Sequence, residues 1–440
     1  MRQYEILVSS RTSFDFQTCP YLVNEESLIF PALVPTMLTN LRRMEIFFAI
    51  LIMAYVFMAW KASNRISQGN SDFIIYYTAA QMIKEDQGQS LYDLALQKQF
   101  QQKILSAIHF QEELLPYNHP PFELIWFRPL ARFPYLTAFL LWDTFSSICF
   151  GLGLMVLIKG SGPHNGEGAV FVILGSLAFL PLFVTLLQGQ DSAMVFLFLV
   201  LTFINLKKLR DARAGLWLSL VLQKFQILIP ILFLLLAKKR WKVLGGFLAG
   251  GGVTLLISLN MVGINGLKRY LLLVIEMATW VNHYGIYPST MHCLRGQIYA
   301  FWFDSHPDLA RGITIATVVL MLGLLFKVWK GKWDVHEPTY DLKFALLILI
   351  SLLVSPHVNF HDLSLLLLPA VLIFQFLLRE PNVCSQTRLT SIALFLVCFP
   401  LLLSTLIVSN LVPIQLSVWG LLALTGLLMN QLKVFEIVRK

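Results

Sequence analysis

The amino-acid sequence predicts an all-α polytopic membrane protein, with about ten spanning helices, a re-entrant hairpin and interfacial helices in the first outside loop. Hydrophobic residues make up 57% of its 440 residues and charged residues only 13%, whereas a soluble domain carries about 25% charged residues. Apolar stretches at 44–60, 135–158, 169–187 and 412–432 meet or approach the roughly 20 residues that cross a bilayer. The net charge of +9 comes largely from lysine and arginine in short loops between such stretches. This is the positive-inside pattern of membrane proteins, so we predict no nucleic-acid partner.

Residues 1–43 precede the first apolar stretch and have a polar, mixed composition. They lack the charged start, apolar centre and small-residue cleavage site of a signal peptide. We predict that 1–43 form a disordered cytoplasmic tail, with a translation start at Met37 or Met44 as the alternative. Residues 44–440 then form a single transmembrane domain with outside loops at 61–132 and 261–310. The five cysteines are scattered without a CxxC pair, so no disulfide framework is expected.

The placement of basic residues sets the expected direction of each span. Arg42 and Arg43 put the start of the first span in the cytoplasm, and most later spans return to a basic cluster. Residues 214–237 break this pattern, because basic clusters flank both of their ends. A full span there would place every later basic loop outside, whereas two half-helices turning near 224–226 keep those loops inside. The charges therefore favour a re-entrant hairpin, which must lie within protein or beside a water-filled cavity.

The outside loops carry elements of their own. Residues 73–82 and 91–108 combine apolar and polar faces, as interfacial helices do, and 267–284 predict a further one. A proline-rich stretch before the second span carries aromatic residues suited to the headgroup level. The run GGFLAGGG at 245–252 lies within an apolar span and predicts close packing of helices.

A small set of polar residues falls at the predicted outer membrane edge. They are Asp72, Gln188, Gln190, Asp191, Lys224, His357, His361 and Asp362. Ionisable groups at this depth are energetically unfavourable, and they are therefore functional candidates.

Four of these residues also have purely structural interpretations. Asp72 is placed to cap the helix that follows it, as is Asp362. Lys224 can snorkel or pair with a buried carboxylate. Gln190 suits a helix-end hydrogen bond as well as it suits a ligand contact.

The two histidines, His357 and His361, are four residues apart and would share one helical face, as metal ligands do. Pro356 lies beside them, however, and no third ligand at zinc spacing is visible, so we predict no metal site. A helix start with two histidines and a lysine nearby suits a phosphate better. No Walker loop, dinucleotide signature or GxSxG occurs, so no cofactor is predicted.

Several stretches together carry a family resemblance. They are SDFIIYYTAAQMI followed by LYD at 91–93, NHPPFELIWFRPLARFP, LQGQDS, AGLWLSLVLQKFQILIP, MHCLRG at 291–296 and SPHVNFHDLSLLLLP. In order and spacing they resemble glycosyltransferase family 87 of the GT-C superfamily, the polyprenol-phosphate-mannose-dependent mannosyltransferases, over most of 44–378. One departure is Phe225, where relatives usually have proline after the lysine.

The resemblance implies a GT-C-like fold and an inverting sugar transfer at the outer face of the plasma (inner) membrane. A polyprenyl-phosphate sugar, by default mannose, would be the donor, and a lipid-linked or glycan molecule the acceptor. Asp72 has the position of the family's catalytic base. The implied substrate-binding residues are Tyr76, Gln190, Lys224, Arg295, His357, His361 and Asp362.

Physical reasoning agrees, because such a reaction needs a carboxylate base and cations for the departing phosphate, and Lys224 and the histidines are the candidates. Membrane lipids are the remaining partners, since interfacial helices and a lipid-facing groove would admit the polyprenyl chain. Two other classes stay open: a transporter or flippase of an amphiphilic lipid, for which no internal hydropathy repeat is visible, and a non-catalytic membrane scaffold.

Overall fold

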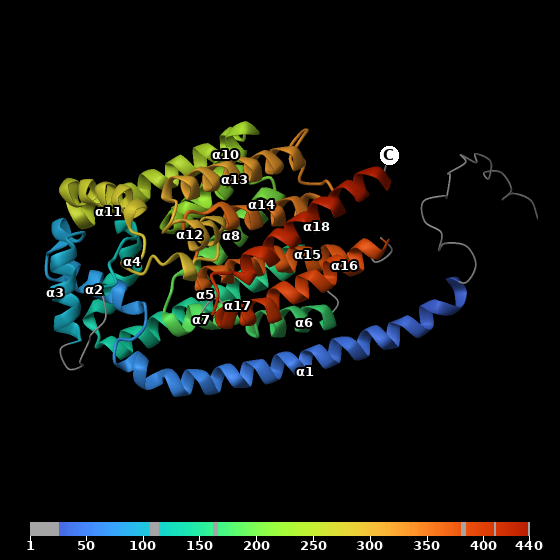
Figure 1. The fold of residues 1–440 in the computed structure, drawn as a ribbon, viewed down its shortest axis with the longest axis horizontal. Coiled ribbons are helices and arrows are strands. Elements are labelled where there is room, and N and C mark those ends of the chain that lie inside the picture. The colour runs from blue at the N-terminus through green and yellow to red at the C-terminus, as the bar shows by residue number, and fades with distance from the viewer. Residues whose placement is uncertain (1–25, 106–113, 162–165, 380–383, 409–410, 439–440) are drawn as a thin grey trace, which may run out of the picture.

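The computed structural model describes residues 26–105, 114–161, 166–379, 384–408 and 411–438, and every regular element among them is a helix (Figure 1). The first half of the chain forms α1 (Glu26–Ser67), α2 (Phe73–Lys84), η1 (Gly88–Ser90), α3 (Leu94–Ile104), η2 (Pro121–Glu123), α4 (Leu124–Phe127), η3 (Arg128–Arg132), α5 (Tyr135–Ser161), α6 (Gly166–Leu177), α7 (Leu180–Gln188), α8 (Ser192–Lys207), α9 (Asp211–Leu220), η4 (Val221–Lys224) and α10 (Phe225–Ala237). The second half forms α11 (Trp241–Glu276), η5 (Met277–Thr279), η6 (Pro288–Thr290), α12 (Leu294–Trp302), α13 (Pro307–Val328), α14 (Tyr340–Val354), η7 (Phe360–Leu366), α15 (Leu367–Arg379), α16 (Cys384–Leu396), η8 (Val397–Leu401), α17 (Leu402–Val408) and α18 (Leu416–Val438). The predicted all-α membrane class is confirmed.

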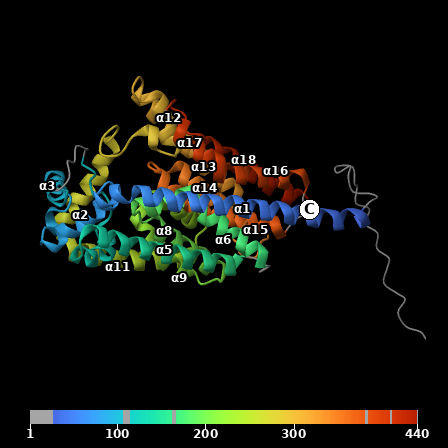
Figure 2. The same ribbon diagram turned by 90° about the horizontal axis from the view of Figure 1, so that it is seen from below.

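The helices of the predicted first outside loop gather at one end of the bundle, which we call the α2 end. Figure 1 shows α2, α3 and α4 together there, and both Figures 1 and 2 show the carboxyl terminus toward the opposite end and α1 lying lengthwise along the bundle. Helices α2 and α3 begin close to the starts of the interfacial helices predicted at 73–82 and 91–108. Because α1 already begins at Glu26, residues 26–43 of the predicted disordered tail are helical, while 1–25 lie outside the described residues.

Six described helical stretches are long and apolar enough to cross a bilayer, among them the run Asp211–Ala237 that is treated below, and the pair α6 and α7 is a seventh if the two count as one span. This pair is bent by 49°, and Pro181 in the first turn of α7 lacks the amide hydrogen that a continuous helix would need. Shorter apolar helices such as α8 run through the bundle as well. The total of about ten spans therefore stays a prediction.

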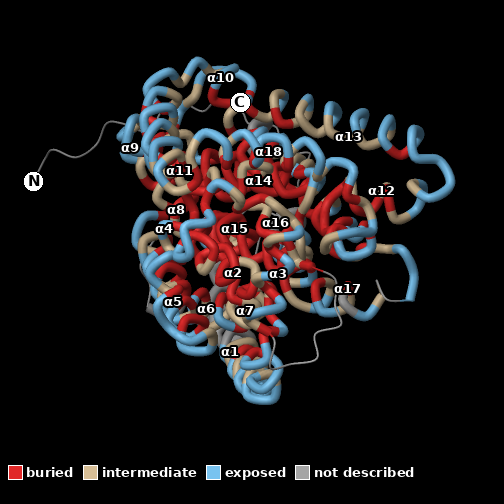
Figure 3. Tube along the Cα trace, turned by 90° about the vertical axis from the view of Figure 1, so that its left-hand side faces the viewer, coloured by how far each residue is buried: buried red, intermediate tan, exposed pale blue. Residues whose placement is uncertain are grey.

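The centre of the bundle is built from α8, α14 and α15, whose residues are almost all buried (Figure 3). The outer helices instead present large apolar side chains: Met53 of α1, Leu248 and Leu256 of α11 and Ile315 of α13 are 64–70% exposed. A soluble protein would not leave so many such side chains facing water, so these surfaces fit contact with lipid.

The predicted cytoplasmic loops meet at the end of the bundle opposite α2, which we call the basic end. Lys207 at the end of α8 and Arg379 at the end of α15 both bind Asp341 at the start of α14, at 2.8 and 3.1 Å. The guanidinium of Arg240 lies 5.2 Å from the ring centre of Trp333 in the loop before α14. The basic loops thus share one side of the fold, as the charge pattern predicts.

The run Asp211–Ala237 is 27 residues long and is apolar enough to be a span by composition. As a straight helix it would be about 40 Å long, at roughly 1.5 Å per residue. Instead Arg240, just beyond its end, donates to Asp211 at its start with an N–O distance of 2.7 Å. The chain therefore doubles back, and the turn falls at η4, where the backbone of Lys224 leaves the helical region with φ −120° and ψ 58°. The predicted re-entrant hairpin is confirmed in the path of the chain.

Glycines let the hairpin and α11 pack side by side. A Cβ added to Gly215 would lie 2.0 Å from the carbonyl oxygen of Val243, and one added to Gly246 would lie 2.1 Å from that of Ala212. Only hydrogen fits at these two positions, so the close packing predicted for GGFLAGGG is confirmed. Farther along, α11 kinks at Gly263, whose φ of 65° and ψ of −178° are essentially restricted to glycine. The helix beyond the kink ends at Glu276 and covers part of the predicted interfacial stretch 267–284.

Candidate active site

Asp72 lies at the start of α2 in a helical backbone conformation, and its side chain makes no capping hydrogen bond. Its Oδ2 instead accepts a hydrogen bond from the amide Nε2 of Gln190 at 2.7 Å. The imidazole Nδ1 of His361 lies 3.8 Å from the same oxygen. The capping interpretation is therefore wrong, and the carboxylate, whose side chain is 27% exposed, faces the centre of the site.

Tyr76, one helical turn after Asp72, holds the Gln190 side-chain amide that contacts Asp72. The hydroxyl of Tyr76 donates to Gln190 Oε1 at 2.8 Å, so both ends of this amide are engaged. The Tyr76 ring is fully buried and stacks on Phe127, with ring centres 4.4 Å apart. The amide orientation is thereby fixed, and one oxygen of Asp72 is fixed with it.

Lys224 at the hairpin tip is enclosed by carboxylates. Its Nζ lies 2.9 Å from Asp191 Oδ1 and 2.6 Å from Asp362 Oδ1, and all three side chains are at most 4% exposed. The contacts of Lys224 thus fit the interpretation from sequence in which this lysine pairs with a buried carboxylate. Its charge is already balanced, so these contacts argue against a free phosphate-binding lysine. The ion triad ties the start of α8, the hairpin and η7 together.

Asp362 takes part in a capping box, but inside η7 and with Asn359 as the N-cap, so it does not precede the helix as predicted. Its Oδ2 accepts the backbone N–H of Asn359, whose side chain in turn accepts from the backbone of Asp362. His361 is fixed beside it, because its Nδ1 lies 3.0 Å from Gln188 Oε1 and its backbone carbonyl accepts from the hydroxyl of Thr185. The motifs LQGQDS and SPHVNFHDLS therefore meet at the site, as predicted.

The remaining predicted site residues are His357 and Arg295. Burial lowers the pKa of His357 to about 4, so its imidazole is neutral near pH 7. Arg295 donates to the carbonyl oxygens of Pro356 and Ala278 at 3.2 and 3.4 Å, and its guanidinium lies over the ring of Tyr299. In the part of the chain that the structure describes, Arg295 is a site cation with no carboxylate against it. Among the described residues, direct contacts thus link six predicted site residues, Asp72, Tyr76, Gln190, Lys224, His361 and Asp362, whereas Arg295 contacts the chain beside His357.

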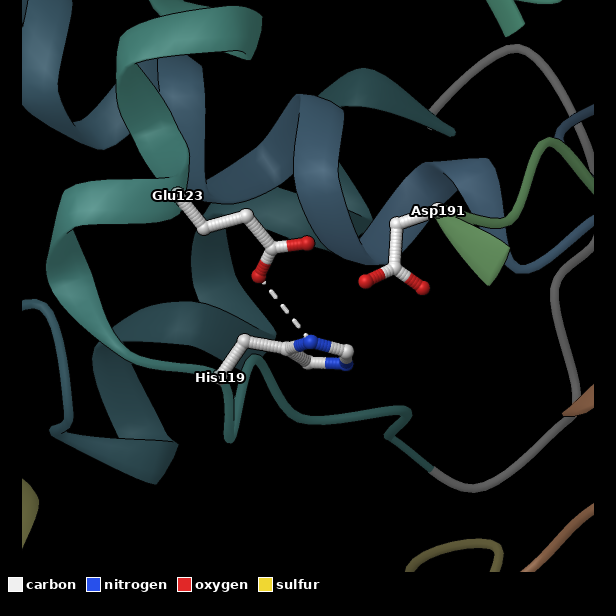
Figure 4. A group of neighbouring side chains, drawn as sticks. All are labelled: His119, Glu123 and Asp191. Carbon is white, nitrogen blue, oxygen red and sulfur yellow. Dashed lines mark ion pairs between the residues drawn. The ribbon is translucent and has the colours of Figure 1, made fainter. Parts of the chain in front are cut away.

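Sequence analysis missed two residues of the site, His119 and Glu123. Their Nδ1 and Oε2 atoms are 3.0 Å apart, and they form a cluster with Asp191, which we call the His119 cluster (Figure 4). Burial raises the pKa of Glu123 to about 7, although the His119 imidazole acts in the opposite direction. Burial also lowers the pKa of His119, but Glu123 outweighs burial and raises it overall. The signal was the i, i+4 spacing of a histidine and a glutamate in NHPPFE.

An apolar cavity of about 320 Å³ lies behind the His119 cluster. Its lining includes Pro120, Phe122, Leu222, Phe225, Leu255 and Tyr270. The first two residues are chain neighbours of His119 and Glu123, and the next two flank the hairpin tip at Lys224. The same two loops therefore carry polar groups toward the site and apolar groups toward the cavity.

Together, these features define a polytopic helical membrane protein with a carboxylate site at the α2 end. The family model for glycosyltransferase family 87 matches residues 117–356, more than half of the chain, and the chain belongs to this family. The matched range contains the His119 cluster and the hairpin, whereas Asp72 and His361 lie outside it. No curated protein and no solved structure matches the chain. The protein is accordingly a membrane glycosyltransferase.

Proposed function

We propose that this glycosyltransferase moves a sugar, mannose by family default, from a polyprenyl-phosphate donor to a lipid-linked or glycan acceptor. The reaction takes place at the outer face of the plasma membrane with inversion at the anomeric carbon, and Asp72 is the base. The observation that carries this proposal is the difference between Asp72 and its neighbours. Asp191, Asp362 and Glu123 are buried at 0–2% exposure, whereas the side chain of Asp72 is 27% exposed.

The proposed step follows from the contacts of Asp72. Gln190 holds Oδ2, and among the described residues no hydrogen bond involves Oδ1. Oδ1 accepts the proton of the acceptor hydroxyl while that oxygen attacks the anomeric carbon. The bond from this carbon to the phosphate oxygen breaks, and polyprenyl phosphate leaves with the bonding electrons. A positioned carboxylate contributes roughly a hundredfold or more to such a step.

The leaving phosphate needs a cation that is not already neutralised. Lys224 has two carboxylates within 3 Å, so the phosphate role proposed from sequence passes to Arg295, whose contacts are carbonyl oxygens and an aromatic ring. His357 is close by, and its Nδ1 is buried without a hydrogen-bond partner. As a neutral imidazole it can donate one hydrogen bond to a phosphate oxygen. His361 contacts Asp72 at 3.8 Å.

Lipid-linked substrates suit the surroundings of the site. The apolar cavity offers room for part of an isoprenoid or acyl chain, and α2 and α3 lie at the end of the bundle where headgroups would be met. The outer-face location rests on the basic end, which the positive-inside rule assigns to the cytoplasm. The site lies away from that end.

The test is sugar transfer by the purified protein in liposomes, with a polyprenyl-phosphate mannose donor and an extracted glycolipid acceptor mixture. Asp72→Asn should lower turnover by roughly a hundredfold or more while the protein stays folded. Asp93→Asn is the matched control, because Asp93 caps α3 in the same loop and asparagine caps equally well. Transfer by Asp72→Asn at the wild-type rate would exclude Asp72 as the base. No transfer by the wild-type protein from mannose or pentose donors would refute the donor class.

A further inference from the structure

The His119 cluster is a convergence of three side chains from two parts of the chain. His119 and Glu123 flank the prolines before α4, and Asp191 immediately precedes α8. One ligand-type atom from each lies within 4.8 Å of the other two. Figure 4 shows the two carboxylates pointing toward one another with the imidazole beside them.

Two oxygens of this cluster have no visible partner. Glu123 Oε2 contacts His119, and Asp191 Oδ1 contacts Lys224. Glu123 Oε1 and Asp191 Oδ2 have no hydrogen-bond partner among the described residues, although both side chains are 0% exposed. Buried carboxylate oxygens without donors are strongly unfavourable, so the pair points to a bound group.

The charge around the cluster is also unbalanced. Asp191 and Asp362 share the ammonium group of Lys224, whereas Glu123 contacts the His119 imidazole and Asp72 contacts the Gln190 amide. With neutral imidazoles, these four carboxylates and one ammonium leave three negative charges when all four carboxylates are ionised. A divalent cation would remove two of the three.

The chemistry of the three side chains suits a transition metal. Tyr76 Oη lies beside His119 Nε2 and can accept its N–H, which leaves the Nδ1 lone pair of the neutral ring facing Glu123 and available to ligate. One imidazole and two carboxylates accommodate Mn²⁺ or Zn²⁺.

We propose that His119, Glu123 and Asp191 bind one divalent cation of the Mn²⁺ or Zn²⁺ type. The site adjoins the groups that hold the base. Tyr76 Oη lies 3.5 Å from His119 Nε2, and Asp191 follows Gln190 in the chain. A bound cation would hold Tyr76 and Gln190, which adjoin the cluster. It would thereby also fix the Gln190 side-chain amide that contacts Asp72. This is a different site from the His357 and His361 pair considered from sequence.

The experiment uses the full-length protein in detergent, stripped with EDTA and titrated with Mn²⁺, with free Mn²⁺ followed by electron paramagnetic resonance. We expect one equivalent to bind the wild-type protein, and Glu123→Gln and His119→Asn to weaken this binding at least about tenfold. Asp143→Asn in α5 is the matched control, because Asp143 Oδ1 is also buried without a partner but belongs to no cluster of ligands. It should bind Mn²⁺ as the wild-type protein does.

Thermal unfolding gives a second measurement that keeps the proposal testable if one variant binds poorly for another reason. Mn²⁺ should raise the melting temperature of the wild-type protein and of Asp143→Asn, but not that of Glu123→Gln. Binding that is weak, non-stoichiometric or equal in wild-type and Glu123→Gln proteins would overturn the proposal. In that case a proton, and not a metal, balances Glu123. Neither measurement needs a sugar donor, so the result is independent of the proposed transfer reaction.

Discussion

Replacing Lys224 by methionine tests what the hairpin tip contributes. The structure places its ammonium 2.6 Å from Asp362 and 2.9 Å from Asp191, with all three side chains at most 4% exposed. Lys224→Met keeps a long apolar stem but leaves two buried carboxylates without their shared cation. Removing one partner of a buried ion pair typically costs about 3–5 kcal/mol, much of it the penalty for the charge that remains. We expect a loss of stability of this size.

The assay is thermal unfolding of the purified protein in detergent, where this loss should appear as a fall of several degrees in apparent melting temperature. Lys224→Met combined with Asp362→Asn should recover part of the loss, because the remaining carboxylates then repel each other less. Lys238→Met, at the other end of the hairpin where the lysine bonds a carbonyl oxygen, is the control and should melt near the wild-type temperature. A Lys224→Met protein with wild-type stability and only a raised KM for donor would refute the structural role. It would restore the phosphate role proposed from sequence.

Three further predictions follow from single contacts. Tyr76→Phe removes the hydroxyl that orients the amide at the base, so kcat should fall roughly fivefold, for a loss of about 1 kcal/mol; an unchanged kcat in the liposome assay would dismiss this positioning role. Cysteines can be introduced at Lys208 and Lys238 in a background without other reactive cysteines. Both should react with a membrane-impermeant thiol reagent from the cytoplasmic side only. Labelling of the two positions from opposite sides would contradict the hairpin. Gly246→Ala should destabilise the protein by about 1–3 kcal/mol in the same unfolding assay, because its new methyl group would lie 2.1 Å from a backbone oxygen. Gly252→Ala is the control, because the space around Gly252 is open, and it should be neutral or slightly stabilising.

The hairpin shows why charge patterns alone predict so much of this fold. Basic residues at both ends of 214–237 force the chain to return to its starting side, and Asp211 and Arg240 are indeed in contact. The same rule places Lys207 and Arg379 at one end, where they share Asp341. The positive-inside rule applies to each short loop separately, because lysine and arginine are enriched in the loops on the cytoplasmic side of the membrane. The charge of a loop therefore indicates the side on which that loop lies.

The partners within the site could not be predicted in the same way. Hydropathy and charge are local properties of the chain, so the sequence alone predicts that Asp72, Gln190, Lys224 and Asp362 are polar groups near a membrane edge. The packing of the helices adds that Asp72 faces the site without capping its helix, that two carboxylates neutralise Lys224, and that Glu123 is buried nearby. These outcomes depend on contacts between distant parts of the chain, such as that between Lys224 and Asp362, 138 positions apart, and such contacts are set by how the helices pack.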